Sequence, residues 1–128
     1  MRYIMMLLIL VGLVGGYANA HQWTPTYPSL SLSHVAGVMK VQMEMFNGRK
    51  DVNWYEVSVH DKDGNPIKFS VGSTSKIFEV PYLKKQTVDI YFRSKDASRV
   101  EYICSKSKIV STNKRVTIVS SRICSKLK

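Results

Sequence analysis

The feature that most constrains the fold is a pair of cysteines, one on each arm of a predicted β-hairpin that runs from Arg99 to Lys126. The first arm, RVEYICSKSK, alternates between two faces, and a second β-branched run, VTIVSS, follows the polar turn TNKR. If the chain folds back at that turn, Cys104 lies opposite position 123 or so, within one residue of Cys124. Because facing residues on neighbouring antiparallel strands come close enough for an S–S bond, we expect a Cys104–Cys124 disulfide.

The chain before this hairpin consists of short alternating runs separated by turn residues. Two of them place apolar side chains on one face and polar side chains on the other, at Val38–Phe46 and Val52–His60. Shorter strands are expected at 67–71, Ile77–Tyr82 and Thr87–Arg93. The pattern amounts to about seven strands with no long amphipathic helix, and it predicts an all-β, immunoglobulin-like antiparallel sandwich whose disulfide joins the last two strands.

The N-terminal segment has the pattern of a cleaved leader peptide. Arg2 supplies one positive charge, an apolar run extends from Ile4 to Val14, and Ala18-Asn19-Ala20 is a cleavage site of the small-x-small type. The apolar run is too short to span a bilayer as a permanent anchor. We therefore expect a signal peptide at 1–20 and one mature domain at 21–128, exported to the periplasm or the extracellular space without a transmembrane anchor.

The expected mature chain is strongly basic. Without Arg2 it has 18 Lys and Arg against 9 Asp and Glu, and ten basic but only two acidic residues lie from Arg93 onward. Such a basic half suggests an anionic partner, such as lipopolysaccharide, an acidic polymer, nucleic acid or the carboxylates of another protein, although no specific nucleic-acid recognition is expected. Lysines at alternating hairpin positions, Lys106, Lys108 and Lys126, equally fit the protection of strand edges against aggregation.

A copper site is one chemical possibility. Cleavage after Ala20 would leave His21 as the first residue, and its α-amine and imidazole can chelate one metal ion together. A second imidazole, from His34 or His60, would complete a nitrogen site suited to Cu(II). In this respect the chain resembles copper-carrying and oxidative polysaccharide-cleaving proteins of the sandwich class, which begin with such a histidine. The simpler alternative is that a signal peptidase must leave some residue first.

Other catalytic signatures are missing from the sequence. The serines have no Gly-x-Ser-x-Gly context, and no pair of carboxylates stands out for acid–base chemistry. A binding role through a strand edge is the remaining interpretation, with Val116 and Ile118 filling gaps in a partner's strand. Basic side chains of the same hairpin would take the partner's carboxylates, and we name Arg115, Arg122 and Lys126 for this. The alternative is that this edge is paired or blunted within one sandwich.

The run KIFEVPYLKKQTVDIYFR, from Lys76 to Arg93, resembles a stretch of periplasmic pilus chaperones. There a short apolar strand, a proline-containing turn and a strand of the QTVRI type follow one another. A disulfide between the last two strands is similar to one subfamily of those chaperones, whose first domain is an immunoglobulin-like sandwich. The resemblance covers roughly residues 38–126 and implies that fold and a chaperone-like role. The chaperones' second domain has no counterpart in these 128 residues.

The two ends of the expected mature chain, HQWTPTYP and SSRICSKLK, also look like small exported proteins encoded by marine bacteriophages, a group that implies no particular activity. Taken together, the patterns predict an exported, non-enzymatic protein-binding module, either chaperone-like or structural, without a cofactor. The alternative is a periplasmic copper-binding protein, or a copper-dependent oxidase, that uses His21.

Overall fold

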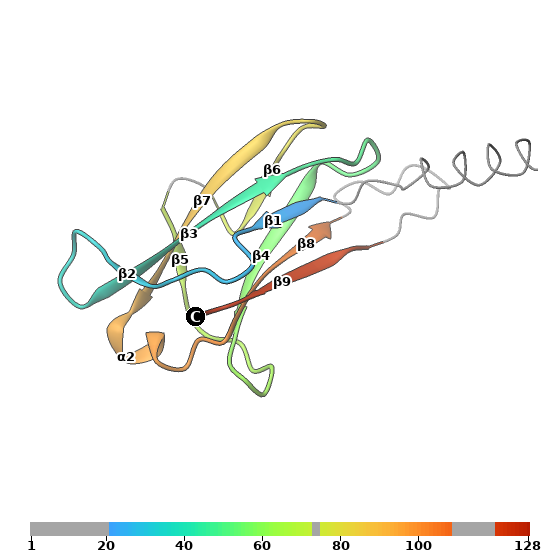
Figure 1. Cartoon of the computed structure of the whole chain (residues 1–128). Helices are drawn as coiled ribbons and strands as arrows, with labels where there is room; N and C mark the ends of the chain where they lie inside the picture. The colour runs from blue at the N-terminus through green and yellow to red at the C-terminus, as the bar shows by residue number, and fades with distance from the viewer. Residues whose placement is uncertain (1–20, 73–74, 109–119) are drawn as a thin grey trace, which may run out of the picture.

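The computed structural model describes residues 21–72, 75–108 and 120–128 (Figure 1). The predicted leader at 1–20 and the predicted turn of the C-terminal hairpin lie outside these residues. Within them, one short helix, α2 (Ser94–Ala97), follows the long central strand of one sheet. The sequence is compatible with a single helical turn at Lys95–Ser98, and the observed helix begins and ends one residue before that.

Nine strands in the described residues form two antiparallel sheets (Figure 1). The first sheet has the order β1-β3-β7-β5, and β2 also pairs with β3. Its strands are β1 (Gln22–Thr24), β2 (Ser31–Leu32), β3 (Val38–Phe46), β5 (Ser70–Val71) and β7 (Lys85–Arg93). The second sheet has the order β6-β4-β8-β9, and its strands are β4 (Trp54–His60), β6 (Ile77–Glu79), β8 (Tyr102–Lys108) and β9 (Arg122–Lys126).

The arrangement confirms the predicted immunoglobulin-like sandwich. The orders β1-β3-β7-β5 and β4-β8-β9 correspond to the A-B-E-D and C-F-G sheets of that fold, with β6 added beside β4. The sequence pattern predicts about seven strands, and the two additional ones are β1 and β2, which form in the lead-in before β3, the segment that contains Pro25 and Pro28. The run at 67–71 keeps only its last two residues as β5.

The core lies between the sheets and follows the period-2 alternation of the sequence. The first sheet contributes Trp23, Val41, Met43, Met45, Val88, Ile90 and Phe92, all buried. The second contributes Tyr55, Val57, Val59, Phe78 and Ile103, also buried. Burial of these apolar surfaces is the main term that stabilises the sandwich. Met43 and Met45 of β3 are therefore core residues, and Met39 is partly buried and packs against the core.

Trp23 joins the two sheets at one edge of the sandwich. Its ring is buried in the core, and its indole Nε1–H donates to the carbonyl oxygen of Ile103 on β8, at 3.0 Å. The core tryptophan thus comes from β1, whereas Trp54 on β4 is only half-buried. A buried indole N–H needs an acceptor, and here the acceptor belongs to the opposite sheet.

The C-terminal end of β9 is bonded on both sides. The N–H of Leu127 donates to Glu101 on the β8 side, at 2.8 Å. The N–H of Lys126 donates to Thr26, at 3.1 Å, and that of Lys128 to Pro28, at 3.0 Å. The lead-in therefore covers this half of the β9 edge, and the half around Arg122 extends beyond it.

We predict that Met43→Ala lowers the free energy of unfolding by about 3 kcal/mol, because it deletes fully buried atoms and leaves a cavity. The matched control is Gln42→Ala, which changes the adjacent exposed residue and removes only a surface hydrogen bond to Asp89. It should cost less than about 1 kcal/mol. Urea unfolding of both variants measures the difference, and equal losses would contradict the assigned core face.

Candidate functional site

The disulfide forms as predicted. Cys104 and Cys124 face each other directly on β8 and β9, with an S–S distance of 2.05 Å. The predicted partner position, 123, is one residue away from the observed one. Ile103 and Ser105 point into the core, so the disulfide between them along the chain lies on the outer face of the second sheet.

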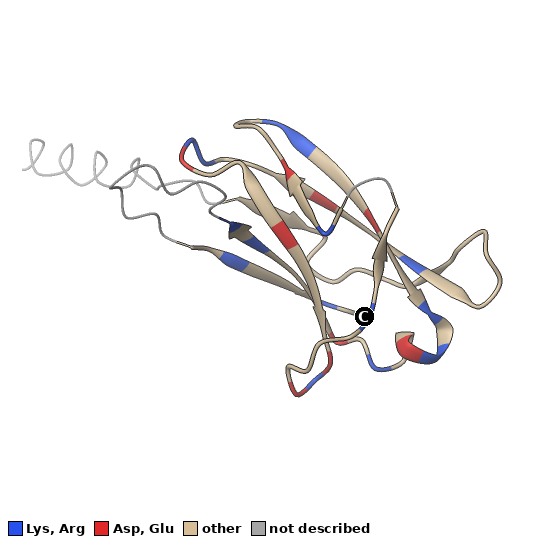
Figure 2. Cartoon of the chain, turned by 180° about the vertical axis from the view of Figure 1, so that it is seen from behind, with Lys and Arg blue, Asp and Glu red and all other residues tan. Residues whose placement is uncertain are grey.

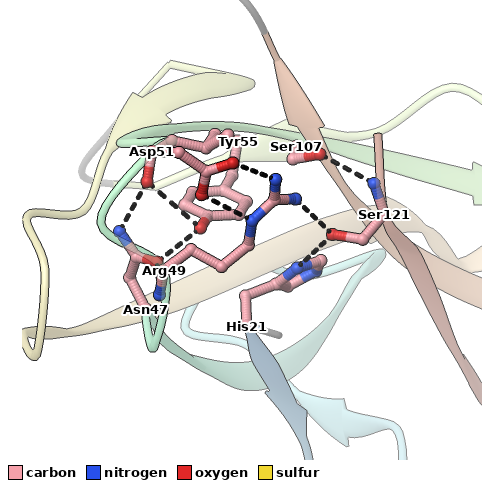
Figure 3. Close-up of polar contacts among 8 residues, drawn as sticks. His21, Asn47, Arg49, Asp51, Tyr55, Ser107 and Ser121 are labelled. Atoms are coloured by element: carbon pink, nitrogen blue, oxygen red, sulfur yellow. Dashed lines mark hydrogen bonds and ion pairs between the residues drawn. The ribbon is translucent and has the colours of Figure 1, made fainter. Parts of the chain in front are cut away.

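A polar cluster occupies one end of the sandwich, where the apolar core stops (Figure 3). It arises because the inward positions of β8 after Ile103 carry serines instead of apolar residues. We use the name polar cluster for His21, Asn47, Arg49, Asp51, Tyr55, Ser105, Ser107 and Ser121. Burying a polar group costs free energy unless the group forms a hydrogen bond, and the residues of the polar cluster bond to one another.

His21 is the centre of the polar cluster. Its side chain is only 2% exposed, and its ring packs at 4.8 Å, centroid to centroid, from that of Tyr55. Nδ1 lies 3.0 Å from Ser121 Oγ, and Nε2 lies 3.0 Å from Ser105 Oγ. The imidazole therefore connects the residue before β1 to both β8 and the start of β9.

The neighbours of His21 favour its neutral form. Ser121 Oγ accepts a hydrogen bond from Arg49 Nη1, at 3.3 Å, so the serine's own proton is free to point at His21 Nδ1. Nε2–H then donates to Ser105. Burial, and to a lesser extent the Arg49 charge, lowers the pKa of His21 to about 4, although the hydrogen bond to Ser105 acts in the opposite direction.

Arg49 lies between the buried ring and the solvent. Its Nε and Nη2 donate to the two carboxylate oxygens of Asp51, at 2.9 and 2.6 Å. This bidentate ion pair holds the pKa of Asp51 below its usual range, chiefly through the hydrogen bonds. The same guanidinium donates to Ser121, so the Arg49–Asp51 pair fixes the position of the hydroxyl that meets His21.

Asn47, which is fully buried, anchors the loop that carries Arg49. Its Nδ2 donates to the carbonyls of Val52 and Val80, both at 2.8 Å. Its Oδ1 accepts from the Arg49 N–H, at 2.8 Å, and from the Tyr55 hydroxyl, at 2.6 Å. Burial raises the pKa of Tyr55 to about 12, so the phenol stays protonated and remains a donor.

The chemistry open to the polar cluster follows from these contacts. The Ser121–His21 distance is that of a nucleophile and its base, but the second ring nitrogen meets the Ser105 hydroxyl where a triad would place a carboxylate. A histidine that acts as a general base becomes positively charged, and burial beside Arg49 opposes that charge on His21. The arrangement instead holds β1, β8 and β9 together, because the His21 ring is hydrogen-bonded to Ser105 on β8 and to Ser121 next to β9.

The three predicted copper ligands lie in different parts of the fold. His21 is inside the sandwich, His34 is exposed between β2 and β3, and His60 is on the outer face of β4. The described part of the chain holds no group of three or more His, Cys, Asp or Glu arranged to bind a metal. The described structure therefore does not bring His21 together with either of the two candidate second imidazoles.

The predicted binding-edge residues divide into two groups. Arg115, Val116 and Ile118 lie outside the described residues. Arg122 projects from the outer face of β9, where its Nη2 donates to His60 Nε2, at 3.0 Å. Lys126 forms an ion pair with Glu101, at 3.4 Å, so its charge already has an acidic neighbour within the chain.

Sequence reasoning missed the polar cluster, except for His21, which it assigned to metal. The one available signal was the spacing of Ser105 and Ser107 on a strand with alternating faces. That spacing does not say which face is buried. The partners Arg49 and Ser121 come from distant parts of the chain and only the fold brings them together.

The described strands and their disulfide define an immunoglobulin-like β-sandwich with a polar end. No protein-family model, curated protein or solved structure matches the chain.

His21 should make the fold sensitive to mild acid. Its pKa is about 4 in the folded chain and near 6.5 when unfolded, so its contribution is complete above pH 6.5 and is lost as the pH falls toward 4. We expect stability to fall by about 2–3 kcal/mol between pH 7 and 4.5 on this account. Urea unfolding should show that His21→Gln flattens the dependence and that His34→Gln, the exposed control, retains it. The same slope in both variants would exclude His21 as its source.

Asn47→Ala should lower the free energy of unfolding by about 3 kcal/mol, because it removes the donor to two buried carbonyls and the 2.6 Å acceptor of the Tyr55 hydroxyl. Tyr55→Phe removes only the hydroxyl, which donates to Asn47 Oδ1 at 2.6 Å and more weakly to the Val52 carbonyl at 3.5 Å, and should cost about 1 kcal/mol. In the Asn47→Ala background the tyrosine change should cost less, since the nearer acceptor is already gone. Thermal or urea unfolding of the double-mutant cycle tests this coupling, and additive losses would disprove it.

Proposed function

We propose that this chain is an exported, non-enzymatic protein-binding module, chaperone-like or structural, that recognises its partner through the β9 edge and the basic C-terminal hairpin. The observation that carries the proposal is the position of β9, which is the last strand of the second sheet among the described strands. An edge strand offers unpaired main-chain groups to which a partner's strand can add.

The main-chain hydrogen bonds show which β9 groups face outward. Ser107 N–H donates to Ser121 O, at 2.9 Å, and Leu127 N–H donates toward β8 as well. Because alternate residues of a strand direct their main-chain groups to opposite sides, the N–H groups of Arg122 and Cys124 point away from β8. The lead-in bonds to β9 only farther along, from Lys126 onward. The first half of β9 is therefore the part proposed to accept a strand.

Charge on the outer face of the same hairpin supports a partner with carboxylates. Arg122 and Lys106 are cross-strand partners on β9 and β8, and both are exposed. Lys108 follows on β8, and its Nζ lies 3.7 Å from Glu56 Oε1 on β4. Figure 2 shows Lys and Arg, in blue, on both β8 and β9. Such exposed ion pairs are weak, so a partner's carboxylate can replace Glu56 at small cost.

The disulfide supports export, because paired cysteines persist mainly in oxidising compartments. No helix in the described residues is long and apolar enough to cross a membrane. The leader at 1–20, the mature domain at 21–128 and a periplasmic or extracellular location remain parts of the proposal.

Native mass spectrometry of the protein, exported with its own N-terminal segment, tests strand addition. We expect a stoichiometric polypeptide partner that is retained in Arg122→Ala and lost in Arg122→Pro. The proline removes the outward N–H and blocks the edge without breaking a β8 hydrogen bond, a position where edge strands tolerate proline. The alanine removes the same side chain and keeps the N–H.

Melting temperatures of both variants establish that they remain folded. A partner that persists in Arg122→Pro would contradict binding through this edge. A bare monomer in the unmodified protein would contradict the binding module itself. Loss of the partner in both variants would point to the guanidinium instead of the main chain.

A further inference from the structure

The two sulfurs of the disulfide differ in access. Cys104 is 0% exposed, whereas Cys124 is exposed on the outer face of β9. Cys124 also lines a hollow of about 350 Å³ together with His60, Gly64, Tyr102 and Arg122. A small thiol can therefore reach Cys124, while the Cys104 sulfur lies behind it.

A positive charge lies at the less accessible sulfur. Arg122 Nη2 is 3.6 Å from Cys104 Sγ and is held there by its 3.0 Å hydrogen bond to His60 Nε2. Because the guanidinium can only donate, His60 Nε2 is the acceptor and its Nδ1 carries the proton. Nδ1 donates to the carbonyl oxygen of Gly64, at 3.3 Å, and Ser58 Oγ lies 2.9 Å from Nε2.

The loop that presents the Gly64 carbonyl is itself fixed. Gly64 has a φ of +85°, a conformation that side chains of L-residues rarely adopt. The Asp61 carboxylate accepts hydrogen bonds from the N–H groups of Asp63 and Asn65, both at 2.9 Å. The chain of contacts from this turn through His60 thus sets the position of Arg122 at the disulfide.

We propose that the Cys104–Cys124 disulfide is a directional thiol–disulfide exchange site, at which an external thiol bonds to Cys124 and Cys104 is the thiolate that leaves, stabilised by Arg122. The substrate class is an accessible thiol, including the dithiol of an oxidoreductase. This inference concerns the outer face of the second sheet and does not depend on the proposed strand binding.

The exchange with a dithiol proceeds in two steps. An external thiolate attacks Cys124 Sγ, the Cys104–Cys124 S–S bond breaks, and a new S–S bond joins the external sulfur to Cys124. The electron pair of the broken bond remains on Cys104, whose thiolate lies beside the Arg122 guanidinium. The second thiol of the same dithiol, as a thiolate, then attacks the reagent sulfur that is bonded to Cys124 and releases Cys124 as a thiolate. The dithiol is oxidised to a disulfide and the protein is reduced by two electrons.

The reverse direction uses the same groups and forms the bond during folding. An oxidoreductase disulfide first transfers a sulfur to Cys124. The Cys104 thiolate, favoured by Arg122, then attacks Cys124 Sγ and expels the oxidoreductase thiolate. His60 acts only through Arg122 and is a positioning residue.

The experiment uses the oxidised full chain and 2-mercaptoethanol, an uncharged monothiol, and samples early times, before a second thiol or the Cys104 thiolate resolves the mixed disulfide. After an acid quench and alkylation of free thiols, peptide mass spectrometry locates the added group. We expect it on Cys124, with Cys104 alkylated. In urea, where neither sulfur is shielded, the two cysteines should react about equally.

A matched pair of variants tests the role of Arg122. Arg122→Gln should slow formation of the mixed disulfide by roughly fivefold, the scale of one exposed charge interaction, without moving it from Cys124. Lys106→Gln removes one charge from the facing position of β8 and should leave the rate nearly unchanged. Urea unfolding of both variants in the oxidised state confirms that they are folded.

Three outcomes would overturn the proposal. The first is a mixed disulfide on Cys104, or on both cysteines equally, in the folded chain. The second is an equal rate for Arg122→Gln and Lys106→Gln. The third is a disulfide that reacts only under conditions that unfold the protein, since the attack would then not occur at the folded site.

Discussion

The register of β8 against β9 is the constraint on which the rest of the structure depends. Cys104 faces Cys124, and this pairing determines which residues of β9 point into the sandwich and which point outward. A slip of one residue would exchange the two faces of β9. Ile123 and Ser125 would then leave the interior, and Arg122 would enter it. The covalent bond prevents that slip, and the same register brings Ser121 to Ser107 and to His21.

The inward serine face of β8 explains how a sandwich with an apolar core tolerates a polar end. Every side chain of the polar cluster has at least one hydrogen-bond partner, and the rings of Tyr55 and His21 are in contact. Arg49 is the only cation in the polar cluster, and Asp51 balances its charge. A satisfied network of this kind favours one arrangement of strands over others, because shifted arrangements leave buried groups unpaired.

Much of the fold could be predicted because it depends on local patterns. The alternation around Met43 and Tyr55 identifies core strands, and counting residues across the last hairpin places Cys104 within one position of its partner. The polar cluster depends on contacts between distant residues, for which alternation carries no signal. His21 illustrates the difference. Its place after a cleavage motif suggested metal binding, whereas the fold surrounds its ring with serine hydroxyls.

The contact between His21 and Ser121 spans 100 positions of the chain. During synthesis, β1 and its neighbouring histidine therefore exist long before the residues that complete their environment. Trp23 likewise precedes by 80 positions the carbonyl of Ile103 that accepts its hydrogen bond. Contacts of such long range slow folding, because the intervening loop must close before they form. The topology thus delays closure of the sandwich until nearly the whole chain is available.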